Sequence, residues 1–166
     1  GVDAYPATMA QVGMAVEADG DPERGLYTIV SSFRIRDQRP VDAAALTGAV
    51  AELTARHDVL RTSVELTGYS VPMQLVHRNA TVPVQVFTDG ADASRVAGFA
   101  AAERAAGLAL GAAPLLRVAA HQDDGAWWLT LTISHLIVGG WDFNSLLADL
   151  VTGYRRRLTG DGTSSL

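Results

Sequence analysis

Alternating apolar and polar residues divide much of the chain into short runs that predict β-strands. Alternation is clearest over 26–36, 60–66 and 127–134, and this pattern is typical of a strand with one face in a core. Gly68 falls between two of these runs and Asp123-Asp124-Gly125 between two others, and both breaks indicate hairpins. The expected strands cover residues 26–36, 60–66, 72–77, 82–87, 115–121 and 127–134.

Apolar residues spaced three and four positions apart predict helices between these strands. The clearest spacing is that of the last helix, whose apolar residues recur from Phe143 to Leu158 and whose start Asp142 is placed to cap. The polar, glycine-containing residues 160–166 that follow are typical of a frayed end or a linker. The expected helices cover residues 7–18, 40–56, 92–106 and 141–158.

This mixture of elements predicts an α/β fold. Because helices and strands do not alternate strictly, we expect an α+β two-layer sandwich, with a mixed sheet and helices on one face, rather than a doubly wound sheet. A chain of 166 residues is long enough for one domain that buries roughly 70% of its unfolded surface. We therefore assign residues 1–159 to one folded unit and 160–166 to its end.

The charge balance gives little support to binding of nucleic acid. The formal net charge is −5, from 18 acidic and 13 basic residues, and every basic residue is an arginine. The one basic cluster, Arg155-Arg156-Arg157, ends a predicted helix, where cations stabilise the helix dipole. Contact with nucleic acid or a carrier protein is the alternative for this cluster. We expect no nucleic-acid partner.

The composition also limits the compartment and the chemistry. The chain has no cysteine, which excludes disulfides, thiolate metal sites and a cysteine nucleophile and fits a cytoplasmic protein. The longest uncharged apolar run, residues 107–116, is far shorter than the roughly 20 residues that span a bilayer. We therefore expect a cytoplasmic protein without a membrane partner.

One histidine stands out because of its place in the pattern. His135 follows a predicted strand that ends at Ser134, and Gly139 and Gly140 follow it before the last helix. This order puts an imidazole at the carboxyl end of a strand, where α/β proteins commonly place chemistry, and imidazoles are suited to proton transfer. Glycines there allow the backbone to approach a substrate closely. The alternative is a tight connection packed under Trp141.

Other catalytic arrangements have little support. Successive side chains of a strand point to opposite faces, so Ser134 and His135 are not expected to form a serine–histidine pair. The other histidines, His57, His77 and His121, are scattered, and none has a second histidine two to four residues away, which argues against a metal site. The sequence contains no Gly-x-Ser-x-Gly elbow and no Walker or dinucleotide-binding loop. The residues alone predict an α/β domain with His135 as a candidate acid or base.

Four segments, taken together, resemble the condensation domains of nonribosomal peptide synthetases. The run from Ser134 to Trp141 resembles the signature His-His-x-x-x-Asp-Gly-Trp, and Arg56-His57-Asp58-Val59-Leu60-Arg61-Thr62 matches the motif Arg-His-x-x-Leu-Arg-Thr. Tyr5-Pro6 followed by Thr8-Met9-Ala10-Gln11 is similar to the opening motif Ser-x-Ala-Gln. Pro114-Leu115-Leu116-Arg117 resembles the segment that enters the strand before the signature. The four segments occur in the order of the family.

The resemblance implies both a fold and a reaction. A condensation domain has two lobes shaped like chloramphenicol acetyltransferase, and this chain resembles the N-terminal lobe, whose neighbour is the C-terminal lobe of the same domain. In the tunnel between the lobes, two carrier proteins present thioesters on phosphopantetheine arms, and the acceptor amine attacks the donor thioester to form an amide. No cofactor is implied to bind the chain directly. Because one lobe supplies only half of the tunnel, we expect it to be inactive alone.

The resemblance also assigns roles to individual residues. His135 matches the catalytic second histidine, which orients or deprotonates the amine or stabilises the tetrahedral intermediate, and Gly140 matches a glycine that lines the site through its backbone. Ser134 replaces the mostly structural first histidine. Gly139 replaces an aspartate that typically holds the loop through an arginine, and Arg61 is the candidate structural arginine. The expected active-site loop comprises Ser134, Gly139, Gly140 and Trp141.

Two other functions stay open beside peptide-bond formation. The replacement at Gly139 fits a degenerate domain that no longer condenses and that docks carriers or tailoring enzymes instead. The second is a free-standing acyltransferase of the same superfamily that acts on a soluble acceptor.

Overall fold

A computed structural model describes residues 2–6, 28–65, 70, 71, 73–135 and 143–159 of the chain. Of the sequence predictions, the helix over 7–18, the turn at Gly68, the cap at Asp142 and the end at 160–166 lie outside the described residues.

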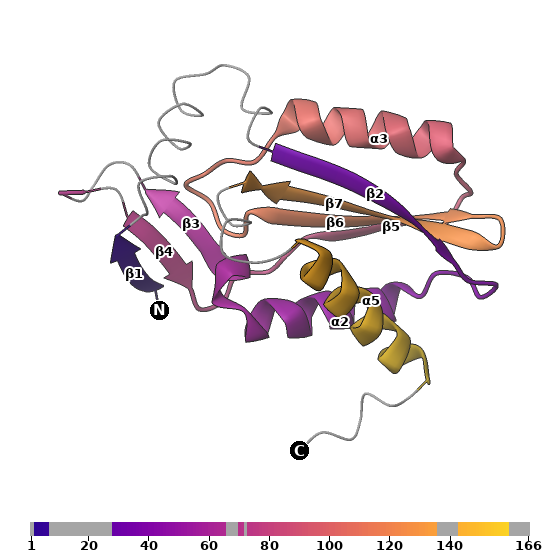
Figure 1. Cartoon of the computed structure of the whole chain (residues 1–166), viewed down its shortest axis with the longest axis horizontal. Helices are drawn as coiled ribbons and strands as arrows, with labels where there is room; N and C mark the ends of the chain where they lie inside the picture. The colour runs from indigo at the N-terminus through magenta and orange to yellow at the C-terminus, as the bar shows by residue number, and fades with distance from the viewer. Residues whose placement is uncertain (1, 7–27, 66–69, 72, 136–142, 160–166) are drawn as a thin grey trace.

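Two separate sheets form within the described part of the chain (Figure 1). The larger sheet has the order β2-β7-β6-β5, with β2 (Thr28–Arg36), β7 (Ala126–Ser134) and β6 (Leu116–Asp123) antiparallel and β5 (Val84–Phe87) parallel to β6. The smaller sheet is antiparallel and has the order β1-β4-β3, formed by Val2–Pro6, Met73–His77 and Thr62–Glu65. The larger sheet confirms the expectation of a mixed sheet.

The hairpin predicted at Asp123-Asp124-Gly125 joins β6 to β7. Asp123 pairs with Ala126, so that Asp124 and Gly125 form the turn. Gly125 has a φ of 65°, a left-handed conformation that glycine adopts without a steric penalty. The choice of glycine at this position therefore follows directly from the turn geometry.

The helices are α2 (Ala43–Arg56), α3 (Ala93–Ala106) and α5 (Phe143–Thr159), with a short 3₁₀ turn, η2, over Asp58–Arg61. Asp42 and Asp92 cap α2 and α3, since each carboxylate accepts a hydrogen bond of 2.9 Å from a backbone N–H in the first turn. The helix that the sequence predicts from residue 40 therefore begins at Ala43. A strand over 60–66 was also only partly right, because a 3₁₀ turn buries Leu60 as completely as a strand would.

The main hydrophobic core lies between one face of the larger sheet and the helices α2 and α5. The apolar side chains of β7 are buried there, and the ring of Trp127 packs against Tyr154 of α5 with centroids 5.0 Å apart. The helix α2 contributes Leu46, Val50 and Leu53, whose three- and four-residue spacing places them on one face and which are all buried. Burying each such aliphatic side chain contributes about 1.5–3 kcal/mol.

Helix α3 covers the opposite face of the same sheet (Figure 1). Its buried residues Val96 and Ala100 are outside the main core cluster, and the Arg104 guanidinium donates a 3.1 Å hydrogen bond to the Val30 carbonyl of β2. Parallel β5 and β6 need a crossover connection, and α3 provides it. The α/β class is thus confirmed, but helices cover both faces of the larger sheet instead of one.

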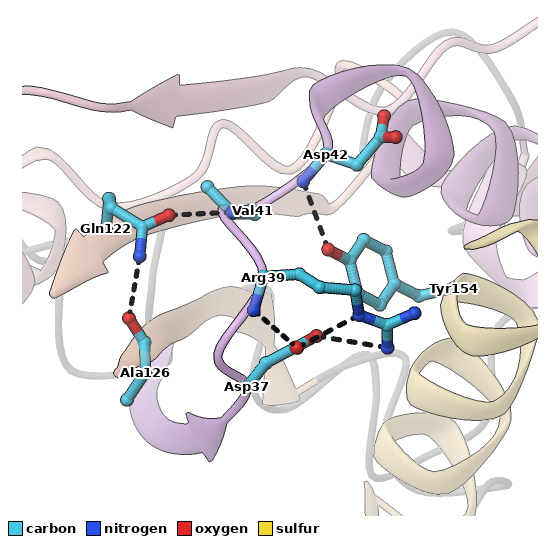
Figure 2. A network of polar contacts seen from close by, with 7 residues as sticks. All are labelled: Asp37, Arg39, Val41, Asp42, Gln122, Ala126 and Tyr154. Atoms are coloured by element: carbon cyan, nitrogen blue, oxygen red, sulfur yellow. Dashed lines mark hydrogen bonds and ion pairs between the residues drawn. The ribbon is translucent and has the colours of Figure 1, made fainter. Parts of the chain in front are cut away.

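The segment that joins β2 to α2 is tied to the β6–β7 hairpin by one amide side chain (Figure 2). The Val41 backbone N–H donates to Oε1 of Gln122 over 2.6 Å, and Nε2 of Gln122 donates to the Ala126 carbonyl over 3.0 Å. The entry to α2 is therefore fixed to the hairpin that leads into β7.

A second contact in Figure 2 joins the same segment to α5. The backbone N–H of Asp42 donates to the phenol oxygen of Tyr154 over 3.0 Å. Tyr154 is 1% exposed, and burial raises the pKa of its hydroxyl, so the ring stays neutral. Beside it, Arg39 forms an exposed ion pair with Asp37 over 3.1 Å. The tyrosine therefore connects α5 to the first turn of α2.

An aromatic cluster lies between α3 and the end of β6. The His121 ring stacks on Phe87 of β5 with centroids 4.6 Å apart and meets Phe99 of α3 edge-on at 4.8 Å. His121 is 2% exposed, and burial is the main cause that lowers its pKa below the usual 6.5. The neutral imidazole is therefore the form that fits this cluster.

We expect Tyr154→Phe to lower the free energy of unfolding by about 1–2 kcal/mol, because the Asp42 N–H loses its partner while the ring keeps its packing. Urea denaturation measures the change. Arg39→Ala, which removes the exposed ion pair, is the control and should cost less than about 1 kcal/mol. Equal losses in the two variants would contradict the role given to the phenol oxygen.

His121 makes the fold sensitive to mild acid. A histidine whose pKa is lowered in the folded state stabilises the fold above the unfolded pKa, and this stability is lost as the pH falls below about 6.5. We expect His121→Leu to flatten the stability profile below pH 6.5. Val71→Ala, at an exposed position without a titratable group, is the control and should keep the slope. An unchanged slope in His121→Leu would show that another group titrates.

Candidate active site

The site that the sequence indicates lies where the central strand of the larger sheet ends. Ser134, the last residue of β7, is 1% exposed, pairs with Thr28 of β2 and donates its backbone N–H to the Leu115 carbonyl over 3.1 Å. His135 follows directly and is exposed. The strand thus brings His135 from a rigid, buried position to the surface in a single residue.

The residues after His135 connect β7 to α5. Gly139, Gly140 and Trp141 of the expected active-site loop lie outside the described residues. The chain is described again from α5, where the ring of Phe143 packs against Phe33 of β2 with centroids 6.0 Å apart. Both anchors of the motif, the end of β7 and the start of α5, are therefore fixed to the larger sheet.

Arg61 is a structural arginine that joins three elements. Its Nε donates to the Thr54 carbonyl in α2 over 3.0 Å, and its Nη1 donates to the His77 carbonyl at the end of β4 over 2.8 Å. Nη2 pairs with the carboxylate of Asp58. The side chain is 14% exposed. The hydrogen bonds and the ion pair that Arg61 forms with described residues all go to α2, η2 and β4. The side chain therefore holds the end of β4 against α2.

Two cavities share Arg78 and Ala80 in their walls, and one of them adjoins Arg61. That cavity, of about 150 Å³, lies between α2 and residues 78–82. The other, of about 370 Å³, lies between His77 at the end of β4 and residues 111–113 of the loop before β6. Neither cavity is lined by His135.

A serine and a histidine meet in the smaller sheet, although sequence reasoning did not bring them together. The hydroxyl of Ser63 lies 2.7 Å from Nε2 of His77 on the neighbouring strand. Ser63 is 0% exposed, which leaves no path for a substrate to reach its hydroxyl. The contact satisfies a buried polar group and strengthens the pairing of β3 with β4.

A polar cluster beneath α3 was missed by sequence reasoning. Oε2 of Glu103 accepts hydrogen bonds from Nε of Arg117 in β6 over 2.7 Å and from the Thr132 hydroxyl in β7 over 2.8 Å. Nη1 of Arg117 also donates to the Gly107 carbonyl over 2.9 Å. Glu103 is the only carboxylate in the alanine-rich α3, and this isolation was the one signal in the sequence.

The described residues hold no group of three histidine, aspartate or glutamate side chains that could bind a metal ion. Within the same residues, no helix is long and apolar enough to cross a membrane.

The α/β fold with its mixed sheet, the four ordered motifs and the histidine that directly follows β7 together point to the condensation-domain family. A family model of the condensation domain matches residues 2–166. The chain belongs to the condensation-domain family. The resemblance inferred from the motifs is therefore confirmed.

Curated relatives are large synthetases. The chain is 33% identical over 168 residues to AMB antimetabolite synthetase AmbE of Pseudomonas aeruginosa, with 95% of this chain and 8% of that protein covered. It is 32% identical over 147 residues to phosphinothricin tripeptide synthetase PhsC of Streptomyces viridochromogenes, with 84% and 13% covered. The chain thus spans a small part of the length of these relatives.

Solved structures share the fold. The starter condensation domain of rhizomide synthetase RzmA matches with a TM-score of 0.79 at 17% identity, over 95% of this chain and 38% of that one. The first condensation domain of the CDA synthetase matches with a TM-score of 0.80 at 17% identity, over 95% and 40%. The predicted fold class is confirmed by these matches.

We expect Arg61→Ala to lower the free energy of unfolding by about 2–4 kcal/mol, because it leaves the Thr54 and His77 carbonyls without their charged donor. Asp58→Asn is the matched control: this carboxylate is 69% exposed, and its loss should cost less than about 1 kcal/mol. Guanidinium denaturation measures both variants. A larger loss in Asp58→Asn than in Arg61→Ala would show that the ion pair, and not the backbone contacts, is the stabilising interaction.

Proposed function

We propose that this chain forms the histidine-bearing half of a condensation domain that makes amide bonds in nonribosomal peptide synthesis. The observation that carries the proposal is the exposed His135, which matches the family's catalytic histidine and directly follows β7, an inner strand with eight of its nine residues buried. Membership in the family supports the reaction class. The relatives named as peptide or antimetabolite synthetases support the same biosynthetic context.

In the proposed reaction, the acceptor amine attacks the carbonyl carbon of the donor thioester. A carbon–nitrogen bond forms, the carbon–sulfur bond breaks, and the proton of the amine ends on the released thiol. His135 orients or deprotonates the amine, or stabilises the charge of the tetrahedral intermediate. Gly140 lines the site through its backbone, while Ser134, Gly139 and Trp141 complete the loop.

The partners follow from the same reaction. Two carrier proteins deliver the donor and the acceptor on phosphopantetheine arms, and the C-terminal lobe of the same domain supplies the other wall of the tunnel. Phosphopantetheine is thus a tether of the substrates and not a cofactor of this chain. Residues 1–159 form the lobe in this proposal, residues 160–166 lead out of it, and the protein works in the cytoplasm.

The second candidate is a docking module that binds loaded carriers but forms no amide. The replacement of the motif aspartate by Gly139 favours it. A loaded-carrier assay on the complete two-lobed domain separates the two functions, since carrier binding without product supports docking and product above background supports condensation. A free-standing acyltransferase is the third candidate, and it would transfer the acyl group to a soluble amine in the same assay without an acceptor carrier.

We expect His135→Ala to lower the rate of amide formation by about 10²–10⁴-fold, which is the typical contribution of a general acid or base. The complete two-lobed domain is supplied with alanyl-loaded donor and acceptor carriers, and dipeptidyl carrier is measured by mass spectrometry. Ser145→Ala, at an exposed position in α5, is the control and should keep the native rate. Amide formation at the native rate in His135→Ala would rule out this role for the histidine.

A further inference from the structure

A polar layer lies between α3 and the larger sheet, on the face opposite the hydrophobic core. Its centre is Glu103, whose carboxylate side chain is 18% exposed and accepts from Arg117 and Thr132 through the same oxygen. Thr132 is 1% exposed, so its hydroxyl has no access to water and depends on this one carboxylate. The layer therefore couples α3, β6 and β7 through specific contacts.

This coupling acts close to the candidate histidine. Thr132 precedes His135 by three residues, and the intervening strand end is held by backbone pairing with β2 and β6. The backbone pairing fixes the strand within the sheet plane. The hydrogen bond from Thr132 to Glu103 is directed at α3 and restrains the strand end perpendicular to that plane.

We propose that Glu103 is a positioning residue that sets the location of His135 by holding Thr132 at the end of β7. The inference rests on the proposed role of His135 in amide formation. Reactions between positioned groups are sensitive to geometry, and a displacement of about 1 Å can cost on the order of 100-fold in rate. Loss of the Glu103 contact lets the strand end shift and slows the chemical step, while binding of the carriers is unaffected.

The chain contains a matched control for this inference. Thr130 lies on the same strand and the same face, two residues further from His135, and is also 1% exposed. Its hydroxyl forms a hydrogen bond of 2.8 Å as well, but with Ser32 of β2 instead of α3. Thr132→Val and Thr130→Val each remove one buried hydroxyl hydrogen bond, to a carboxylate in the first case and to a serine hydroxyl in the second, and both keep a β-branched side chain suited to a strand.

The test uses the complete two-lobed domain with alanyl-loaded donor and acceptor carriers. Thr132→Val should lower kcat for dipeptide formation by about 10- to 100-fold, with KM for the acceptor carrier unchanged. Thr130→Val should keep kcat within about twofold of the native value, and the melting temperature of each variant is measured so that a loss of rate is separated from a loss of stability. Equal kcat values in the two variants, or a fall in kcat that follows the melting temperature, would overturn the inference.

Rescue by a conservative variant separates positioning from charge. In Glu103→Gln the amide carbonyl oxygen can still accept hydrogen bonds from both Thr132 and Arg117, so this variant should retain most of the native kcat. Glu103→Ala should lower kcat as Thr132→Val does. Equally low rates for Glu103→Gln and Glu103→Ala would overturn the hydrogen-bond route. Failure of the proposed function looks different: the native domain forms no dipeptide, or His135→Ala forms it at the native rate.

Discussion

Burial of β7 on both of its faces is the constraint on which the rest of the structure depends. The strand lies between β2 and β6, and eight of its nine residues are buried. A strand in this position must form backbone hydrogen bonds with a neighbour on each side and must present side chains that pack against a layer on each face. In this chain the two outer layers have different chemistry, and that difference decides how each helix docks.

On one face, β7 presents large apolar side chains to α2 and α5. Trp127, Leu129 and Leu131 are each 0% exposed. The free energy that their burial contributes depends on the apolar area removed from water and requires no particular orientation of the partner. On the other face it presents the hydroxyls of Thr130 and Thr132, which need partners placed at hydrogen-bonding distance. The apolar face therefore supplies stability to the lobe, and the polar face fixes where α3 lies along the sheet.

The apolar face was predictable from the sequence, and the polar face was not. The alternation of β7 and the helical spacing of Leu46, Val50 and Leu53 lead directly to one core layer. Alanine-rich α3 has no marked apolar stripe, so its position depends on contacts between residues far apart in the sequence. These are the polar contacts of Glu103 with Arg117 and Thr132 and the ring contacts of Phe99 with Phe87 and His121. This is why helices were expected on one face only.

For the candidate site too, local features could be predicted and long-range ones could not. The sequence placed His135 at a strand end, because strand-like alternation followed by glycines and a helical period is a local signal. The division of the strands into two sheets is set by long-range pairing, such as that of β1 with β4, which leaves no local trace. The 3₁₀ turn at η2 was missed for the opposite reason, since its last two residues, Leu60 and Arg61, continue the alternation of β3.

The surroundings of Arg61 bear on the meaning of the altered motif. Replacing the motif aspartate by Gly139 would be costly if it left a buried arginine without a partner, because an unpaired buried charge destabilises a fold by several kcal/mol. Arg61 has its own carboxylate partner in Asp58 and two backbone carbonyls, all in elements other than β7. Its charge is therefore compensated without a carboxylate at position 139. The glycine alone is thus weak evidence for a degenerate domain, and the exposed histidine keeps its weight in favour of condensation.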